Sequence, residues 1–382
     1  MSDFVLTVIG GGNCGHTLAG LGPKEVETRV MTRRPEDWNQ RIEVFYESDT
    51  TPISEADISI ISSNPEDVIP GSDLILICGP VYVYDEILSR IAPYVDPDSH
   101  VGLLYAQGCT HFNAQSLLPN SYFFGFQTIP WLCKTMEYGK KARIIGPQKS
   151  LRVATNSPDK DKLSSWLERI LRHSTITFLP NFLSTTLTPS NQIVHAGRYY
   201  GIFHNWDGVS PYSEEDIPLL YEDMDEFSAD CIGRLSDELQ LIKQGIIKEL
   251  PEVNLDYVKP LDERLAEDFS DLVKDKSSLK TIYATSYAHR GVKTPVREFK
   301  GGFAPNPDTR FFKDDIPYGL CIMKWYAEML KIDTPWTDAM VEWHQNLMDK
   351  EYIVNGKLVG KDAHECGTPA FYGVQTLKEA VI

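Results

Sequence analysis

The sequence lacks several features that would assign it to a membrane, a secretory route or a metal site. No apolar run of its 382 residues approaches the roughly 18–20 that a membrane-spanning helix needs, and the opening MSDFVLTVIGGG has no basic stretch of the signal-peptide kind. The seven cysteines are scattered and form no CxxC pair, which favours reduced thiols over a zinc site or a disulfide framework. These absences predict a cytoplasmic protein with no membrane partner and no metal.

Positive charge is also scarce. Lysine and arginine number 37 against 54 aspartates and glutamates, which gives a formal net charge of -17. Such an acidic chain has no general attraction for nucleic acid or for an anionic lipid surface, so neither is predicted as a partner. Anionic small molecules could still bind, through local arginines and the N-termini of helices.

Length and pattern predict two domains of different class. A chain of 382 residues exceeds the roughly 250–300 at which a single core stops growing. Up to about residue 185, short β-branched runs alternate with helical spacing, whereas later segments such as 219–250 and 335–348 are almost entirely helical in pattern. We therefore predict an α/β fold, with an N-terminal Rossmann-type dinucleotide-binding domain over 1–185 and a mostly α-helical substrate and catalytic domain over 186–382.

A glycine-rich turn near the N-terminus carries the first functional signal. It comprises Gly10, Gly11, Gly12, Asn13, Cys14 and Gly15, and it joins a predicted strand over 4–9 to a predicted helix over 13–21. In that context G-x-G-x-x-G lets a backbone approach a pyrophosphate at a helix N-terminus, although a tight turn without ligand is the alternative. Gly79 and Pro80 follow a buried strand over 74–78, where a nicotinamide ring would lie, but such turns also occur without a cofactor.

The acidic residue that would grip the adenine ribose, about 20 positions further on, is missing. The second strand ends instead in Thr32, Arg33 and Arg34. Their guanidinium groups could bind a 2′-phosphate, or they could be two solvated arginines beside a proline. The sequence therefore predicts NAD(H) or NADP(H) and leaves the choice open.

Two clusters supply candidate acid–base groups. His195 lies in NQIVHAGRYYGIFHNWDG, and on a helix Arg198 and Tyr199 would share its face, so a base would stand beside a cation able to hold a carboxylate. The alternative is a structural histidine at a domain interface. In TRFFKDDIPYG, Asp315 is either the N-cap of a following helix or the partner of a histidine, and Arg310 could pair with a substrate carboxylate.

Five separated blocks resemble the opine dehydrogenase family, in particular the octopine and tauropine dehydrogenases of marine invertebrates. The blocks are GGGNCGHTLAGL, TIPWLCKTMEYGKK, IVHAGRYYG with the nearby WDG, RFFKDDIPYG, and KEYIVNGKLVGKD with PAFYG. They occur in family order and cover almost the whole chain.

The resemblance implies an NAD(P)H-dependent reductive condensation of an α-keto acid, usually pyruvate, with the amino group of an amino acid or taurine. It assigns proton transfer to His195, with Asp315 as its partner and Arg310 in the same site. It places Gln107, Thr128 and Cys133 along the substrate pockets. We expect small-molecule substrates and a monomer or a homodimer.

Two departures from the family pattern bear on specificity. Arg33 and Arg34 stand where the invertebrate enzymes look neutral, and segment 261–280 lacks the aromatic residues of the arginine-using members. These departures put L-arginine in doubt as the amine, and a smaller donor such as alanine, glycine or taurine, or another amino acid, is at least as plausible. The rival functions are a dehydrogenase that reduces a 2-keto acid to a hydroxy acid, and a dinucleotide sensor without catalysis.

Overall fold

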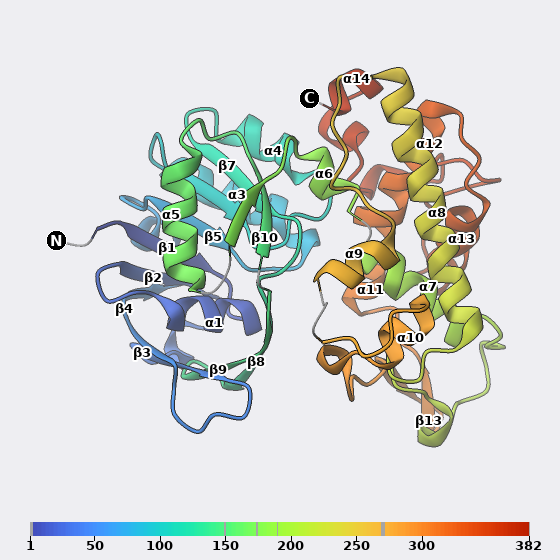
Figure 1. Ribbon diagram of the computed structural model, residues 1–382, viewed down its shortest axis with the longest axis horizontal. Coiled ribbons are helices and arrows are strands. Elements are labelled where there is room, and N and C mark those ends of the chain that lie inside the picture. Colours follow the sequence, from blue (N-terminus) through green and yellow to red (C-terminus); the bar gives the residue numbers. More distant parts are fainter. Residues whose placement is uncertain (1–2, 149, 173–174, 189, 269–271, 382) are drawn as a thin grey trace. The chain divides into compact units, whose positions relative to one another are not determined.

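A computed structural model describes residues 3–148, 150–172, 175–188, 190–268 and 272–381 of the chain. The chain divides into two compact units, 1–185 and 186–382, and each is described by itself (Figure 1). The assignment of cofactor binding to the first and catalysis to the second stays a prediction. The sequence also shows helical spacing over 261–273, and this segment includes residues 269–271, which lie outside the described residues.

The first unit is built on a sheet of eleven strands in the order β11-β10-β7-β6-β5-β1-β2-β4-β3-β9-β8. The strands are β1 Val5–Ile9, β2 Glu27–Met31, β3 Arg41–Tyr46, β4 Ser54–Ser62, β5 Leu74–Ile77, β6 His100–Leu103, β7 Tyr122–Phe126, β8 Trp131–Glu137, β9 Lys141–Pro147, β10 Ser150–Thr155 and β11 Thr175–Phe178. The helices are α1 Asn13–Leu21, α2 Pro65–Val68, α3 Tyr84–Ile91, α4 Thr110–Leu117, α5 Lys160–Leu171 and α6 Leu183–Thr186.

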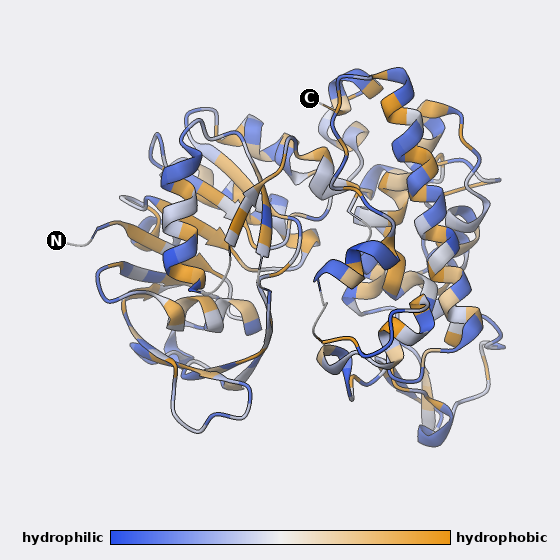
Figure 2. Cartoon of the chain, in the orientation of Figure 1, coloured by the Kyte–Doolittle hydropathy of each residue, from blue (hydrophilic) through white to orange (hydrophobic). Residues whose placement is uncertain are grey.

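The middle of this sheet is parallel and buried. Strand β1 lies between β2 and β5, and β6 and β7 continue the parallel run. All four residues of β5, the segment LILI, are buried, because strands of a parallel sheet are covered on both faces. In Figure 2 these central strands are orange, whereas α5 carries blue residues along one side.

The order of the strands creates a position at which a ligand can bind. From β1 it proceeds through α1 to β2 on one side, and it later returns to β5 on the other side of β1. The strand order therefore reverses at β1, and ligands of open α/β sheets bind at such a point, outside the carboxyl ends of the strands. The glycine-rich turn that follows β1 occupies this position.

Helix α4 and strand β8 are among the elements of the first unit that the sequence pattern did not predict. Helix α4 carries polar residues without a clear apolar stripe, and strand β8, with the sequence WLCKTME, does not alternate strictly. Strand β8 lies at the end of the sheet, and β9 is the neighbour with which it pairs. Its pairing with β9 has irregularities after Leu132 and after Thr135, which accounts for the weak alternation.

The second unit is mostly helical. Its helices are α7 Asn191–Phe203, α8 Glu226–Glu249, α9 Leu261–Asp268, α10 Leu279–Ala284, α11 Arg310–Lys313, α12 Cys321–Leu330, α13 Pro335–Leu347 and α14 Leu377–Ala380. Strands β12 Val296–Phe299 and β13 Gly302–Pro305 form an antiparallel pair, and a π-helical turn spans Ile316–Leu320.

Helix α7 is held against α8 by two glycines. A Cβ at Gly197 would lie 2.8–3.1 Å from atoms of Ile232, and a Cβ at Gly201 would lie 2.1 Å from the hydroxyl oxygen of Ser228. These separations are shorter than van der Waals contacts, so the two backbones approach in a way that no larger side chain permits. The position of α7, which carries His195, therefore depends on these two positions having no side chain.

We expect Gly201→Ala to lower the free energy of unfolding by about 1–3 kcal/mol, because the added methyl group forces α7 away from α8. The matched control is Gly233→Ala in the interior of α8, where the nearest atom is 3.6 Å away. That change should stabilise the chain by about 0.5–1 kcal/mol through helix propensity. Urea unfolding of both variants tests the pair, and equal effects would contradict the role given to Gly201.

Candidate functional site

The glycine-rich turn is shaped by two close backbone contacts. Gly10 has φ +126°, which side chains of L-residues rarely adopt, and a Cβ there would lie 2.2 Å from the carbonyl oxygen of Cys78. A Cβ at Gly15 would lie 1.9 Å from the carbonyl oxygen of Gly10. Gly12 is different, because its Cβ direction points into open space. The turn is thus tightly closed on its inner side and open above Gly12.

This open side fits a dinucleotide pyrophosphate. Helix α1 begins here with no side chain capping its N-terminus and with no acidic residue in its first turn. The N–H groups of the first turn and the helix dipole therefore favour an anion. The glycines, the strand before them and the helix after them match the arrangement expected of such a site.

Several other predicted residues follow strands at the same edge of the sheet. Thr32 follows β2, Gly79 and Pro80 follow β5, Gln107 comes after β6, and Thr128 comes after β7. These strands run parallel to β1, so their carboxyl ends lie along one edge with the glycine-rich turn. The fold thus brings these predicted cofactor and substrate residues to one edge, although their roles stay a prediction.

The two arginines after β2 differ in their surroundings. The guanidinium of Arg34 lies 4.1 Å from the ring centre of Tyr138 and 3.6 Å from the carboxylate of Asp37. Arg33 is exposed. A 2′-phosphate contact and a solvated surface pair both remain compatible with this arrangement.

Strand β8 and the turn after it are attached to the first residues of α1. The side-chain oxygen of Asn13 accepts the N–H of Thr135 at 2.9 Å, and Nε2 of His16 accepts the N–H of Gly139 at 2.7 Å. Because Nε2 of His16 accepts, its proton lies on Nδ1 and is donated to the carbonyl oxygen of Gly12 at 2.9 Å. Burial lowers the pKa of His16, which keeps the ring in this neutral form.

Cys133, predicted to line a substrate pocket, lies on β8 against Cys14 of the glycine-rich turn. Their sulfur atoms are 3.8 Å apart. This places a predicted substrate residue and a predicted cofactor residue in direct contact.

The second unit contains a buried acid–base cluster centred on His195. Nδ1 of His195 is 2.8 Å from a carboxylate oxygen of Asp315, and Nε2 is 3.0 Å from the hydroxyl of Tyr221. The ring of Phe311 is stacked on the imidazole, with 3.8 Å between ring centres. Since a carboxylate can only accept, Nδ1 carries the proton, and Nε2 accepts a hydrogen bond from Tyr221.

Asp315 stands at the N-cap position of the turn over Ile316–Leu320, but its side chain makes no capping hydrogen bond. The carboxylate bonds His195 instead, and Asp315 is only 1% exposed. Of the two alternatives left open by the sequence, the histidine partner therefore agrees with the side-chain geometry.

Opposing influences set the protonation of this cluster. Burial lowers the pKa of His195 and outweighs the negative charge of Asp315 and its hydrogen bond, which raise it, while the positive charge of Arg310 lowers it further. Burial also raises the pKa of Tyr221, so its hydroxyl stays protonated and can donate. At neutral pH the imidazole of His195 is therefore neutral, and the lone pair on its Nε2 accepts the hydrogen bond from Tyr221.

Tyr221 is a site residue that the sequence analysis missed. It lies in a loop between α7 and α8, and no periodicity links it to His195. Its ring stacks on that of Tyr283 at 5.5 Å and contacts that of His289 at 4.6 Å. Only the fold brings these aromatic rings to the imidazole.

Arg198 does not have the predicted environment. It was expected to offer a cation to a substrate carboxylate, but it is completely buried and all five of its N–H donors are used within the chain. The acceptors are the carbonyl oxygens of Leu219, Leu220 and Asp223, the carboxylate of Asp225 and the hydroxyl of Ser228. These bonds leave no donor for a ligand, so we replace the substrate role of Arg198 by a structural one: it fixes the loop over 219–225 that presents Tyr221 to His195.

Arg310 lies at the start of α11, is exposed, and is close enough to lower the pKa values of both His195 and Tyr221. The predicted trio of His195, Arg310 and Asp315 is thus brought together in the second unit. An exposed cation beside a buried base suits recognition of a carboxylate.

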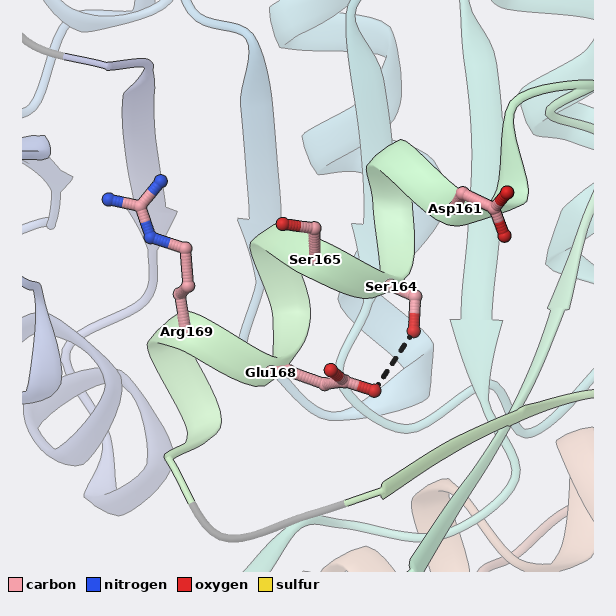
Figure 3. A pocket seen from close by; sticks show the side chains of 5 residues that line it. All are labelled: Asp161, Ser164, Ser165, Glu168 and Arg169. Atoms are coloured by element: carbon pink, nitrogen blue, oxygen red, sulfur yellow. Dashed lines mark hydrogen bonds between the residues drawn. The ribbon is translucent and has the colours of Figure 1, made fainter.

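A shallow pocket elsewhere has no part in this chemistry. It is lined by Asp161, Ser164, Ser165, Glu168 and Arg169, which all project from one face of α5 (Figure 3). Glu168 bonds Ser164, and Arg169 pairs with Asp3 at 2.9 Å. Within the ranges that the structure describes, no three metal-binding side chains converge, and no helix is long and apolar enough to span a membrane.

Comparisons with known proteins agree with this organisation. Residues 178–348 match the family described as NAD/NADP octopine/nopaline dehydrogenase, alpha-helical domain. The chain is 29% identical to an opine dehydrogenase of Haliotis discus hannai, over 99% of this chain and 98% of that protein. It is also 29% identical to a tauropine dehydrogenase of Arabella iricolor, over 98% of each.

Solved structures of octopine dehydrogenase share the fold over the whole chain. One, with NADH and L-arginine, superposes with a TM-score of 0.87 and 27% identity, over 99% of this chain and 98% of that one. Another, with NADH and pyruvate, gives 0.84 and 27%, over 98% and 97%. The predicted fold class, a Rossmann-type unit followed by a helical one, is confirmed.

The contrast between Gly12 and Gly15 is testable. Gly15→Ala should lower the thermal unfolding midpoint, because its Cβ would clash with the Gly10 carbonyl oxygen. Gly12→Ala should change stability by less than about 1 kcal/mol. If the pyrophosphate lies above Gly12, the added methyl group should nevertheless weaken the affinity of this variant for NADH or NADPH at least about 10-fold relative to wild type. Fluorescence titration measures this affinity. Unchanged affinity would contradict the placement.

Proposed function

We propose that this chain, a member of the opine dehydrogenase family, uses NADH or NADPH to join an α-keto acid and an amino compound into a secondary amine. The observation that carries the proposal is the buried His195 held between Asp315 and Tyr221, with the positive charge of Arg310 beside them. A reaction that forms an imine needs such a base, because the amine must lose protons before and after it attacks the carbonyl carbon.

His195 is the proton acceptor in this proposal. Asp315 holds the proton of Nδ1, so Nε2 is the nitrogen that can take a proton from the ammonium group of the amine. The resulting imidazolium is stabilised by the adjacent carboxylate, and it can return the proton to the carbinolamine hydroxyl that leaves as water. The lowered pKa of His195 keeps it ready as a base at neutral pH.

Tyr221 controls access to that nitrogen. Its hydroxyl occupies the lone pair of Nε2, so His195 can accept a proton only when Tyr221 releases it or passes the proton on. Four of the five hydrogen bonds of Arg198 fix the loop that carries Tyr221, which favours a relay through a stationary hydroxyl over a large swing of the loop. Arg198 is thus a positioning residue.

Arg310 is the proposed anchor for the carboxylate of the keto acid. Its charge also favours the developing negative charge on the carbonyl oxygen during amine attack. Octopine dehydrogenase has been solved with pyruvate and with L-arginine, and we propose pyruvate as the keto acid here. Because segment 261–280 does not carry the aromatic residues that the resemblance associates with the arginine-using members, we propose a smaller amine than arginine.

The cofactor side of the proposal rests on the glycine-rich turn. The first turn of α1 would hold the pyrophosphate, with Gly12, Asn13 and Cys14 presenting backbone to it. A bound nicotinamide dinucleotide supplies the hydride that reduces the imine carbon. Thr32, Arg33 and Arg34 would face the adenosine end, and Gly79 and Pro80 the nicotinamide end.

The decisive experiment measures whether cofactor oxidation depends on the amine. NADH or NADPH absorbance is followed with pyruvate alone and with pyruvate plus each of alanine, glycine, taurine and arginine. We expect oxidation only when both substrates are present, with arginine among the weaker amines. Equal rates with and without amine would instead support a 2-keto acid reductase, and tight cofactor binding without turnover would support a sensor.

The pH dependence of kcat/KM tests the roles of the residues around His195. The base must be neutral, and burial lowers its pKa, so the acid limb of the wild-type profile should lie below pH 6.5. Asp315→Asn removes the contributions that raise this pKa, so the limb should move to lower pH while kcat falls by about 10²–10⁴. Tyr221→Phe removes a hydrogen bond that only neutral imidazole accepts, so the limb should move to higher pH.

The acid limb should move in opposite directions in these two variants, which distinguishes their specific effects on His195 from a general disturbance of the fold. Gly233→Ala serves as the control, with an unchanged profile. Shifts in the same direction for Asp315→Asn and Tyr221→Phe would contradict the proposed arrangement of protons.

A further inference from the structure

Two cysteines of the first unit are held in contact at the start of α1. The sulfur atoms of Cys14 and Cys133 are 3.8 Å apart, close to the sum of two sulfur radii. Cys14 belongs to the glycine-rich turn, and Cys133 lies on β8 beside an irregularity in its pairing with β9. Neither cysteine forms a disulfide.

The contact is fixed by hydrogen bonds on both sides of the thiols. Asn13 accepts from the backbone of Thr135, and His16 accepts from the backbone of Gly139. These bonds attach β8 and the following turn to the residues immediately around Cys14. The sulfur atoms therefore face one another because the two backbones are held in place, and not merely through the choice of side-chain rotamers.

The surroundings also favour a reactive thiolate. The pKa of Cys133 is lowered, chiefly by the hydrogen bond with the Cys14 thiol. Burial raises this pKa, but a further hydrogen bond with Thr17 lowers it again. The N-terminal end of α1 adds a field that favours negative charge. Cys78, the neighbouring cysteine next to Gly10, behaves differently, because burial raises its pKa.

We propose that Cys14 and Cys133 form a reversible disulfide that closes the glycine-rich turn to its ligand. With hydrogen peroxide as the oxidant, the Cys133 thiolate attacks one peroxide oxygen, which gives a sulfenic acid and releases hydroxide. The Cys14 thiolate then displaces the sulfenic hydroxyl, and the disulfide forms. In total two thiols lose two electrons and two protons, and one peroxide becomes two waters.

Closure follows from where the movement must occur. A disulfide requires the sulfur atoms to approach to about 2.05 Å. The turn has no slack, because Gly15 already lies against the Gly10 carbonyl. Strand β8 is an edge strand paired with β9, so it is β8 that moves, toward the N-terminus of α1. This consequence for the dinucleotide rests on the proposed function, whereas formation of the disulfide does not.

The test begins with mapping the disulfide in the full chain. After peroxide treatment we expect two of the seven thiols to be lost, a mass lower by about 2 Da, and full recovery with dithiothreitol. Trypsin leaves Cys109 and Cys133 in one peptide, 91–134, so chymotrypsin is added to separate them. The expected product links the peptides of Cys14 and Cys133.

Variants then identify the thiols independently of activity. Cys14→Ser and Cys133→Ser should each abolish the linked product, whereas Cys78→Ser should keep it. Absence of a linked product, or a product joined through Cys78 or Cys109, would overturn the proposal.

Affinity for NADH and NADPH is measured last, on reduced and oxidised Cys78→Ser protein by fluorescence titration. We expect oxidation to weaken the affinity at least tenfold, with recovery on reduction. If the reduced chain binds and the linked chain binds equally well, closure is refuted. If the reduced chain binds neither dinucleotide, the proposed function fails while the disulfide mapping still stands.

Discussion

The hydrogen bond between His195 and Asp315 is the interaction on which the chemistry of the second unit depends. It removes both groups from water as a pair, and it fixes the imidazole proton on Nδ1. Every later feature of the cluster follows from that assignment. Tyr221 must donate to Nε2, and Arg198 must be fully bonded to keep the loop of Tyr221 in place. A different tautomer would leave Tyr221 with no acceptor on the ring.

The first unit has a comparable dependence on backbone contact. Gly10 and Gly15 close the turn after β1 so tightly that the N-terminus of α1 faces outward over Gly12. The same few residues also hold β8, through Asn13, His16 and Cys14. A single helical turn therefore shapes a candidate anion site and carries one cysteine of the candidate redox pair. A structural change at the candidate anion site would therefore also affect the candidate redox pair, and the reverse.

Sequence reasoning succeeded where the signal is local. The turn after β1 was found because glycine spacing and strand–helix context report backbone geometry directly, and β5 was found because LILI can only be a buried run. Only the resemblance assigned Asp315 and Arg310 to the site of His195, since nothing in their spacing from His195 implies contact, and their roles stay a prediction. The surroundings of Arg198 do not favour the substrate role predicted for it. Helical periodicity puts this residue on the same face as His195 but cannot reveal that five acceptors surround its guanidinium group. Tyr221 and the Cys14–Cys133 contact escaped because they arise between segments far apart in the chain.

The glycine seat of α7 on α8 has a consequence for anyone who wishes to redesign this protein. Glycines 197 and 201 have no side chain that could contribute to a site, yet the contact with α8 leaves no space for a side chain at either position. Directed evolution that reshapes a substrate pocket by displacing α7 would therefore be limited first by the contacts of these two glycines with α8. The more tolerant element is the loop over 219–225, which Arg198 holds through side-chain hydrogen bonds and which also bonds the backbone of Val292. New specificities are therefore more accessible by rebuilding that loop together with Arg198 than by any adjustment of the helix that carries the histidine.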